Sequence, residues 1–415
     1  MAAPAPWAAT DNEEIGGISP KFKGPLTLPA MPFQQHPSFE EIPAQAWNAL
    51  LDRQDEPTPF LRWEFLHALE ASGCTTSETG WQPLPVTVTD DRGSLIGAAP
   101  LYAKGHSYGE YVFDWAWADA YERAGFRYFP KLLIASPFSP IPGSRLLADS
   151  DAARDELLVG ITDLLEATQC SSAHILFPDA KDLSNAQSKG WLTRQAIQFH
   201  WHNRGFQDFD DYLASLTQPK RKKIKAERRK VRDAHVTCAV KTGDEITEED
   251  LAFFFECYRQ TYDEHLSTPY LNLAFFLRLA SAMKNQLALC IATRHDKPIA
   301  SALLLHDRGV AYGRYWGALE RIDCLHFEVA YYTPIDWAIR NGITRFEGGA
   351  QGAHKLARGF TPVTTNSAHY LREPRFREAV SRFLERESQG IAQTVEELES
   401  RTPFKPEQRL VLPTL

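Results

Sequence analysis

"PVTVTDDRGSLIGAAPLYAKGHSYGEY" (residues 85–111) and "LCIATRHDKPIASALLLHDRGVAYGRY" (residues 289–315) share one plan, and this plan decides the fold. Each stretch reads as a strand, a polar turn, a second strand, a turn and a third strand. Both end in Tyr-Gly-x-Tyr, and their turns "DDRG" and "RHDK" lie 204 positions apart. We therefore expect an internal duplication with two structurally equivalent halves.

A helix and then a short strand follow each of these stretches. In "ARDELLVGITDLLEA" (153–167) and "LHFEVAYYTPIDWAIRNG" (325–342) apolar residues recur with the 3.6-residue period of an amphipathic helix. The apolar segments "SSAHILF" (171–177) and "ITRFEGG" (343–349) then read as strands. This order predicts the α+β class, with two halves that are each a mixed β-sheet covered by helices. Two tandem GNAT-like domains have this order, which many other α+β folds share.

The length of the chain sets the expected domain boundaries. A chain of 415 residues with 43% hydrophobic residues has enough core for two domains of roughly 180 residues. We expect a flexible N-terminal tail at 1–38, a first GNAT-like domain at 39–198, a second at 199–386, and a C-terminal helix and tail at 387–415.

The N-terminal residues and the hydropathy of the chain indicate the cellular compartment in which we expect the protein. The N-terminal residues lack a basic region followed by an apolar stretch, and no window is long and apolar enough for a membrane span. We therefore expect a soluble, cytoplasmic protein. The six cysteines form no C-x-x-C pair, which predicts neither disulfides nor structural zinc.

A basic run, "TQPKRKKIKAERRKV" (217–231), contrasts with the net charge of -8. Nine of the thirteen residues from Lys220 to Arg232 are Lys or Arg, and Ile224 and Val231 are seven residues apart, so the run suits an exposed helix with a narrow apolar seam. Three readings of such a helix are open: a solvated face, a contact for phosphate or RNA, and a contact for a membrane surface. The residues that we expect to make this contact are Lys220, Arg221, Lys222, Lys223 and Arg228. The run has no interleaved aromatic residues for base stacking, and we do not expect sequence-specific DNA binding.

Four long motifs resemble one known family. They are "HSYGEYVFDWAWADAYERAG" (106–125), "IQFHWHNRGFQDFDDYLASLTQPKRKKIKAERRKV" (197–231), "YGRYWGALERIDCLHFEVAYYTPIDWAIRNG" (312–342) and "FEGGAQGAHKLARGFTP" (346–362). In this order they resemble the Fem-type (FemAB-like) branch of the GNAT acyltransferase superfamily, specifically its bacterial subgroup of N-acyltransferases labelled peptidoglycan biosynthesis/recognition. The resemblance covers roughly residues 45–405.

This resemblance implies a fold, an activity and partners. Fem-type relatives have two GNAT-like domains and transfer an amino acid from aminoacyl-tRNA to an amine of a cell-wall precursor. It implies an N-acyltransferase whose co-substrate is aminoacyl-tRNA, whose partner is an amine-bearing small molecule or a cell-wall precursor, and whose basic run has a polyanion to contact.

Acyl transfer to an amine sets the chemical requirements of the site. It needs a deprotonated amine, a donor for the developing oxyanion and a proton for the leaving group. The sequence contains no G-x-S-x-G motif and no cysteine in a recognisable nucleophile context, so we expect direct transfer without a covalent intermediate.

The densest group of candidates lies in "FEGGAQGAHKLARGF" (346–360). Its glycines allow a ligand to approach the backbone closely, and a plain glycine turn is the alternative. We expect Glu347 and Lys355 to be catalytic. The expected substrate contacts here are Gly349, Gln351, His354 and Arg358.

The family resemblance points to a lysine in the same stretch. Fem-type enzymes carry a Phe-Lys pair whose lysine lies near the transferred carbonyl. Alignment on Gly359 and Phe360 places Ala357 at that position, with Arg358 adjacent and Lys355 two residues earlier. Either Lys355 or Arg358 is expected to take the role.

Two acidic residues among aromatic ones are candidates in the first half. Burial would raise the pKa of Glu110 or Asp114 and suit the carboxylate to accept a proton from an amine. A carboxylate satisfied by arginine or backbone partners is the alternative. We expect Glu110 to be catalytic, with substrate contacts from Asp114 and Tyr108.

Further candidates come from the second half. His200 and His202 are two residues apart, which places both on one face of a strand; His202 is expected to bind substrate or act as a base. No third ligand at a telling spacing accompanies the histidines, so no metal is expected. The remaining expected substrate contacts are Tyr312, Arg314 and Glu328.

Two other functions remain open. An acyl-CoA-dependent N-acyltransferase would need a glycine-rich pyrophosphate loop, for which Gly143 and Arg145 in "SPFSPIPGSRL" are the better match. A non-catalytic protein that binds a precursor is the third reading. No cofactor is certain, and either aminoacyl-tRNA or acyl-CoA is expected as co-substrate.

Overall fold

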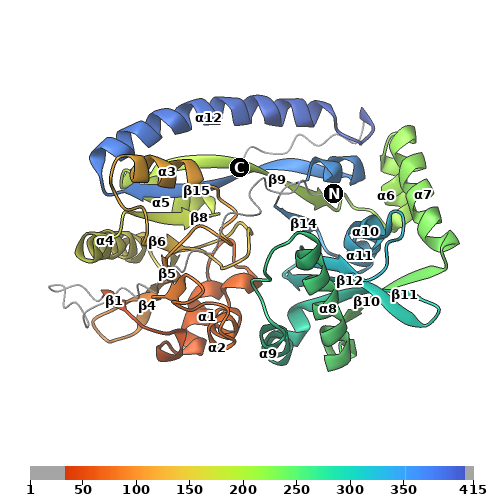
Figure 1. Cartoon of the computed structure of the whole chain (residues 1–415), viewed down its shortest axis with the longest axis horizontal. Helices are drawn as coiled ribbons and strands as arrows, with labels where there is room; N and C mark the ends of the chain where they lie inside the picture. The colour runs from red at the N-terminus through yellow and green to blue at the C-terminus, as the bar shows by residue number, and fades with distance from the viewer. Residues whose placement is uncertain (1–32, 351, 407–415) are drawn as a thin grey trace. The chain divides into compact units, whose positions relative to one another are not determined.

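The computed structural model describes residues 33–350 and 352–406, and the chain folds into two compact units (Figure 1). Within the described residues the N-terminal unit contains 33–196 and 365–392, and the C-terminal unit contains 197–364 and 393–406. The first division lies two residues before the boundary that the sequence suggests. Residues 365–386, however, fold with the N-terminal unit and not with the second domain.

The N-terminal unit contains two sheets. One has the strand order β1-β3-β4-β7, and in the other β15, β8, β6, β5 and β2 are neighbours in this order. The strands are β1 (Phe33–Gln35), β2 (Trp81–Pro83), β3 (Val86–Thr89), β4 (Leu95–Ala99), β5 (Leu101–Lys104), β6 (Lys131–Ile134), β7 (Leu147–Ala148), β8 (Ser172–Leu176) and β15 (Phe360–Leu371). The expected tail, 1–38, lies outside the described residues as far as residue 32, and its last part contains β1, which pairs with β3.

Helices cover these sheets. They are α1 (Ala44–Asp52), α2 (Trp63–Ala71), α3 (Trp115–Arg123), α4 (Asp151–Thr168), α5 (Ala180–Ser188) and α12 (Pro374–Ser400), with 3-10 turns at η1 (Phe39–Glu41) and η2 (Pro59–Leu61). Strand β15 belongs to this unit from residue 365 onward, and α12 belongs to it up to residue 392. The expected helix at 153–167 is confirmed as α4, whose side chains Leu157, Ile161 and Leu165 are fully buried against β3 and β4. Ser150 caps its N-terminus by accepting a hydrogen bond from the Ala153 N–H.

The expectation of two equivalent strand repeats is wrong for the first copy. Pro100 separates β4 from β5, and these two strands belong to different sheets. The first Tyr-Gly-x-Tyr motif forms a turn, because Gly109 and Tyr111 have positive φ angles of 79° and 61°. In the second copy the motif lies inside strand β13.

The C-terminal unit contains one mixed sheet, with the strand order β10-β11-β12-β13-β14-β9. The strands are β9 (Leu192–His202), β10 (Val236–Thr242), β11 (Leu287–Arg294), β12 (Lys297–Asp307), β13 (Val310–Ala318) and β14 (Arg345–Ala350). Strands β13 and β14 are parallel, and the other pairs for which a register is given are antiparallel.

The helices of this unit are α6 (Phe209–Ser215), α7 (Gln218–Asp233), α8 (Glu248–Glu264), α9 (Leu273–Met283), α10 (Leu325–Phe327) and α11 (Thr333–Arg340), with a π-helical segment η5 (Glu328–Tyr332) and 3-10 turns η3 (Gly243–Glu245), η4 (Lys284–Gln286) and η6 (Ala353–Arg358). The expected helix at 325–342 is thus continuous but contains a π-helical turn immediately before Pro334. A proline lacks the N–H of a regular α-helical hydrogen bond, which accounts for the irregular turn.

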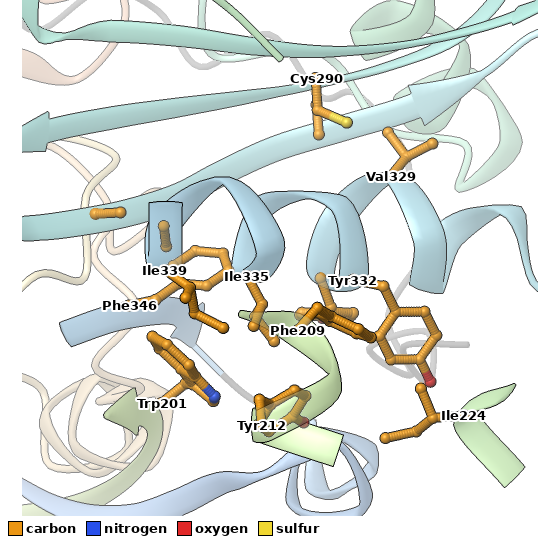
Figure 2. Close-up of a cluster of buried hydrophobic side chains, with 14 of the residues drawn as sticks. Trp201, Phe209, Tyr212, Ile224, Cys290, Val329, Tyr332, Ile335, Ile339 and Phe346 are labelled. Carbon is orange, nitrogen blue, oxygen red and sulfur yellow. The ribbon is translucent and has the colours of Figure 1, made fainter. Parts of the chain in front are cut away.

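One core joins α6, α7, η5 and α11 to the sheet of this unit. In Figure 2 Tyr332, Ile335 and Ile339 belong to one buried cluster with Phe209 and Tyr212 of α6. Ile224 and Val231 of α7 are each 1% exposed and belong to the same core, so the apolar seam expected for the basic run is confirmed. No helix in the described part of the chain is long and apolar enough to cross a membrane.

Candidate functional site

The parallel strands β13 and β14 pair over a short distance only. Val310, Ala311 and Tyr312 pair with Arg345, Phe346 and Glu347, and beyond Glu347 no further pair joins the two strands in the described residues. At the same point β13 contains a β-bulge, because Leu303 and Leu304 of β12 pair with Tyr315 and Gly313, leaving Arg314 as the extra residue. Bulges of this kind often lie next to active sites, where they redirect a side chain.

Glu347 lies at the last pair of this short ladder. Its side chain is 1% exposed, and its Oε1 atom is 3.1 Å from Nε of Arg345. Its Oε2 atom is 3.8 Å from Nε2 of His200, the residue that faces it on β9. A buried carboxylate with a cationic partner is thus held beside the end of the parallel ladder, where Tyr312 is its neighbour on β13.

His202 lies opposite Arg345 in the β9–β14 ladder. Burial, assisted by the charges of Arg345 and Arg204, lowers its pKa to about 4, so the ring is neutral at pH 7. Its Nε2 atom is buried and has no hydrogen-bond partner within the described residues. His202 and Glu347 thus lie on two neighbouring strands, β9 and β14. A neutral imidazole with a free ring nitrogen can accept a proton or a hydrogen bond from a substrate.

Lys355 lies in η6, immediately after β14. Its side chain is buried, and Nζ donates to the carbonyl oxygens of Gly349 at 3.0 Å and Ala350 at 3.3 Å. Burial, followed by the charge of Arg314, lowers its pKa to about 7. A Cβ atom at Gly348 would lie 3.2 Å from Cδ and Cε of Lys355, so the glycine allows the lysine chain to lie against β14.

Arg358 points elsewhere, although it is only three residues from Lys355. Its Nη2 atom donates to both carboxylate oxygens of Glu227 at 3.2 and 3.1 Å, and its Nη1 atom donates to the His354 carbonyl at 2.8 Å. The guanidinium also stacks 3.3 Å from the ring centre of Phe327. Lys355 is therefore the basic residue that lies against β14, and Arg358 ties η6 to α7.

An aromatic cluster adjoins η6. His354 Nε2 lies 3.2 Å from the Tyr331 hydroxyl, and the ring of His326 packs on Trp316 with 4.4 Å between centres. Burial, with His354 as the next contributor, lowers the pKa of His326 to about 3, and burial with Lys355 next lowers the pKa of His354 to about 4. Both imidazoles are neutral at pH 7, so they can exchange hydrogen bonds without adding charge.

Glu328 and the basic helix contact each other. Arg228 donates to both oxygens of Glu328 at 2.9 to 3.1 Å, and Thr333 donates to the same carboxylate at 3.0 Å. Two expected ligand contacts, Arg228 and Glu328, thus neutralise one another. Of the other cations expected to contact phosphate, Lys222 and Lys223 are exposed, and Lys220 and Arg221 are half-buried.

Glu110 lies in the N-terminal unit, within a buried ionic cluster that the sequence did not predict. Lys131 donates to Glu110 Oε2 at 2.8 Å, to Asp114 Oδ2 at 2.5 Å and to Ser107 Oγ at 2.9 Å. The only hint of Lys131 in the sequence is a lone lysine at the start of an apolar strand, "KLLI". Tyr108, from the same loop, is 37% exposed.

The charges in this cluster set the proton affinities of its carboxylates. Burial raises the pKa of Glu110 to about 7, although Lys131 opposes the shift. Burial acts on Asp114 as well, but there the charges of Lys131 and His174 outweigh it and lower the pKa. The raised pKa expected for a carboxylate in this loop is thus found for Glu110 and not for Asp114.

A hydrogen-bonded chain continues from this cluster into the sheet. The Tyr128 hydroxyl donates to Asp114 at 2.5 Å and lies 3.4 Å from His174 Nε2. His174 and His369 then face each other with 2.7 Å between their Nδ1 atoms. Polar side chains therefore connect the loop at Glu110 with strand β15 through the interior of the N-terminal unit.

The remaining expectations concern ligands. Gln351 lies outside the described residues. Arg145 is buried and donates to the carbonyls of Ile141, Gly143 and Ser144 of its own loop, and the two-residue strand β7 follows instead of a helix N-terminus. This loop is thus poorly suited to hold a pyrophosphate. The described residues include no group of three or more His, Cys, Asp or Glu side chains arranged to hold a metal ion.

Comparison with known sequences identifies the family. A profile of the FemAB-like family, described as peptidoglycan biosynthesis/recognition, matches residues 38–406 of this chain. The chain belongs to the FemAB-like family. The resemblance seen in the four sequence motifs is thereby confirmed. No curated protein matches this FemAB-like chain in sequence at a significant level.

Comparison with solved structures extends this result to the fold. A crystal structure of FemX covers 82% of the FemAB-like chain and 98% of its own length, with 12% identity and a TM-score of 0.54. A conserved protein of unknown function from Bacteroides thetaiotaomicron covers the same shares with 10% identity and a TM-score of 0.50. The α+β class that the sequence predicts is confirmed, and the chain shares its fold with FemX.

Proposed function

We propose that this chain is an acyltransferase that moves an aminoacyl group from an activated ester to an amine, with its reaction centre in the C-terminal unit at Lys355 and Glu347. The observation that carries the proposal is the position of Lys355. Its buried ammonium group, with a pKa near 7, donates to the carbonyl oxygens of Gly349 and Ala350 at the end of β14 and is close enough to the bulged Arg314 for that charge to lower its pKa.

The proposed reaction is a direct displacement. The acceptor amine attacks the ester carbonyl, a C–N bond forms, and the C–O bond to the leaving hydroxyl breaks. Lys355 in its ammonium form donates a hydrogen bond to the developing oxyanion and a proton to the leaving oxygen. The proton released by the attacking amine passes to Glu347, and neutral His202 orients the amine from the neighbouring strand.

The donor and the acceptor are proposed from the family and from the surface charge. The FemAB-like family description favours a peptidoglycan precursor with a free amine as acceptor. The exposed cations of α7 suit a polyanionic donor such as aminoacyl-tRNA. An acyl-CoA donor is less favoured because Arg145 already donates hydrogen bonds to the carbonyl oxygens of Gly143 and Ser144 in its own loop.

A transfer assay with two donors tests the proposal. Purified protein is incubated with a peptidoglycan precursor peptide that has a free side-chain amine, and either labelled aminoacyl-tRNA or a panel of labelled acyl-CoA thioesters is added. We expect a new amide product, found by mass spectrometry, with aminoacyl-tRNA only. The Lys355→Met variant should lose at least about 100-fold in rate, as expected for the loss of one oxyanion donor.

Three results would each contradict a different part of the proposed function. A product with thioesters alone would contradict the donor proposed here and retain the acyltransfer. Saturable retention of a precursor without any product from either donor would favour the non-catalytic reading. An unchanged rate in Lys355→Met, with the folded state verified by circular dichroism, would remove Lys355 from the reaction centre.

A further inference from the structure

A groove with a mixed polar and apolar lining lies in the C-terminal unit, along strand β10. It has a volume of about 530 Å³, and its walls come from the C-terminal half of α7 and from η5 and α11. All of its lining residues belong to the C-terminal unit. None of the residues assigned above to the reaction centre lines it, so the groove needs a separate explanation.

The groove follows the free edge of a sheet. Strand β10 ends the strand order and pairs only with β11 among the described strands. Five consecutive residues, Val236–Val240, line the groove, so both faces of the strand and its backbone edge contribute to it. An unpaired strand edge offers a row of N–H and C=O groups to another extended chain.

Helix α11 forms the opposite wall with one face. The lining residues Thr333, Trp337 and Arg340 recur at the spacing of successive helical turns, together with their neighbours Asp336 and Asn341. The opposite face of α11 is buried in the core through Ile335 and Ile339. The wall is therefore fixed in position by the packing of the same helix.

The charges in the groove do not balance. Arg228 is paired with Glu328, and Arg340 is paired with Asp336 on the next turn. Arg232 also lines the groove, is exposed, and forms no ion pair with a described side chain. Three arginines thus face two carboxylates, and the nearby cations of α7 add to a positive potential that attracts anions.

From this geometry we infer that the groove binds an extended, acidic polypeptide segment, which adds as a strand to the free edge of β10 and places a carboxylate against Arg232. Five residues of edge strand correspond to about 17 Å of extended chain, at ~3.4 Å per residue. Main-chain hydrogen bonds would provide the affinity, and the unbalanced arginine would select for acidic side chains. The inference does not depend on the proposed acyltransfer.

A peptide suits the groove better than RNA does. Single-stranded RNA is usually held by aromatic side chains on which its bases stack, whereas Trp337 is the sole aromatic residue among those that line the groove. A continuous strand edge, in contrast, repeats at the spacing of a polypeptide. The observations therefore favour a protein partner with a carboxylate-bearing segment.

Binding of a model peptide to the full chain tests the inference. The probes are a seven-residue peptide of alternating Val and Glu, its Val and Lys counterpart, a short single-stranded RNA and inorganic phosphate. Binding is measured by calorimetry, and backbone protection by hydrogen exchange with mass spectrometry. We expect saturable binding of the acidic peptide, with slowed amide exchange within Val236–Val240.

Two matched variants locate the contact. Arg232→Glu should weaken binding of the acidic peptide about fivefold, the upper end of what one exposed ion pair contributes. Arg229→Glu makes the same charge change on the same helix, at an exposed residue outside the groove lining, and should change the affinity less than twofold.

Four results would overturn the inference. They are no saturable binding of the acidic peptide, equal binding of the lysine peptide, binding without protection of the β10 amides, and equal losses in Arg232→Glu and Arg229→Glu. Binding of RNA or phosphate with no binding of the peptide would assign the groove to a nucleic acid or a simple anion instead.

Discussion

Glu227 and Arg358 form a buried ion pair that connects the basic helix α7 with the turn that carries Lys355. The two residues are 131 positions apart, and Tyr332 donates a further hydrogen bond to the same carboxylate. The one acidic residue inside the basic run is thus a structural partner. Because Arg358 also holds the His354 carbonyl, this pair fixes the whole of η6.

The Glu227→Gln substitution should therefore loosen η6. Removing one partner of a buried pair leaves the other charge uncompensated, and we expect a loss of about 3 kcal/mol in the free energy of unfolding. Hydrogen exchange at residues 354–358 should rise with it. Glu249→Gln, at an exposed position of α8, is the control, and an equal effect of both substitutions would argue against the role given to Glu227.

The Lys355→Met substitution should stabilise the protein at pH 7. The pKa of Lys355 is about 7 in the folded chain and about 10.4 in an unfolded one, so between these values the unfolded state binds more protons. The wild-type free energy of unfolding should then rise from pH 7 to pH 10, and the advantage of the variant should shrink. Urea denaturation at both pH values measures it.

A matched substitution separates this effect from general changes. Lys223→Met removes a lysine that is 60% exposed and should give the same small difference from wild type at both pH values. If Lys355→Met were less stable than wild type at pH 7, the buried ammonium group would have to gain more from its surroundings than burial costs.

The Lys131→Met substitution should destabilise the N-terminal unit strongly. It would leave two buried carboxylates without their cation, and we expect a loss of about 3–5 kcal/mol by urea denaturation. Lys189→Met also breaks a lysine pair at 2.7 Å, with Asp155, but at the surface. That control should cost less than about 1 kcal/mol, and comparable losses would contradict the burial argument.

The Glu110→Gln substitution should change how stability depends on pH. The folded pKa of Glu110, about 7, lies above that of an unfolded glutamate, so its contribution is fully present below about pH 4.3 and is lost as pH rises through 7. The wild-type free energy of unfolding minus that of the variant should be larger at pH 5 than at pH 8. An equal difference at pH 5 and pH 8 would show that Glu110 is already ionised at pH 5, because an unfolded glutamate is also ionised throughout this range.

The Gly348→Ala substitution should impair transfer without unfolding the chain. The added methyl group meets Cδ and Cε of Lys355 at 3.2 Å and Phe360 at 3.1 Å, so the lysine chain must move. We expect at least about a tenfold lower rate, in line with the sensitivity of reactions to misplacement of about 1 Å. Gly390→Ala on α12 meets no atom within 4 Å and should leave the rate unchanged.

Local patterns in the sequence predicted the helices at 153–167, 217–231 and 325–342 because their apolar residues recur at helical spacing. The stripe in α4 and the seam of Ile224 and Val231 are examples, since burial follows directly from their spacing. The prediction of a strand at the first Tyr-Gly-x-Tyr motif was wrong. It rested on the similarity of the two copies, and the same motif forms a strand only in the second copy. Only the backbone reveals the positive φ angles of Gly109 and Tyr111.

The candidate site was predictable by residue type but not by partner. Glu347 lies on β14, His202 on the neighbouring strand β9 and Lys355 in the turn after β14, all in the C-terminal unit, whereas Glu110 belongs to the N-terminal unit. The pairings of Lys131 with Glu110 and of Arg358 with Glu227 join residues far apart in sequence. Lys131 is a single lysine in an apolar strand, and Glu227 is a single glutamate in a basic helix. No repeating pattern in the sequence indicates which residue each of them pairs with.

Strand β15 has a consequence for how this protein is made. It supplies a neighbour to β8, yet it is encoded some 180 residues later, after nearly all of the C-terminal unit. Domains usually fold in the order in which they are synthesised. In this protein the sheet of the N-terminal unit stays incomplete until residue 371 has left the ribosome. A fragment that stops at residue 196 should therefore expose the edge of β8 and aggregate, and a separately expressed N-terminal unit would need residues 365–392 joined to it.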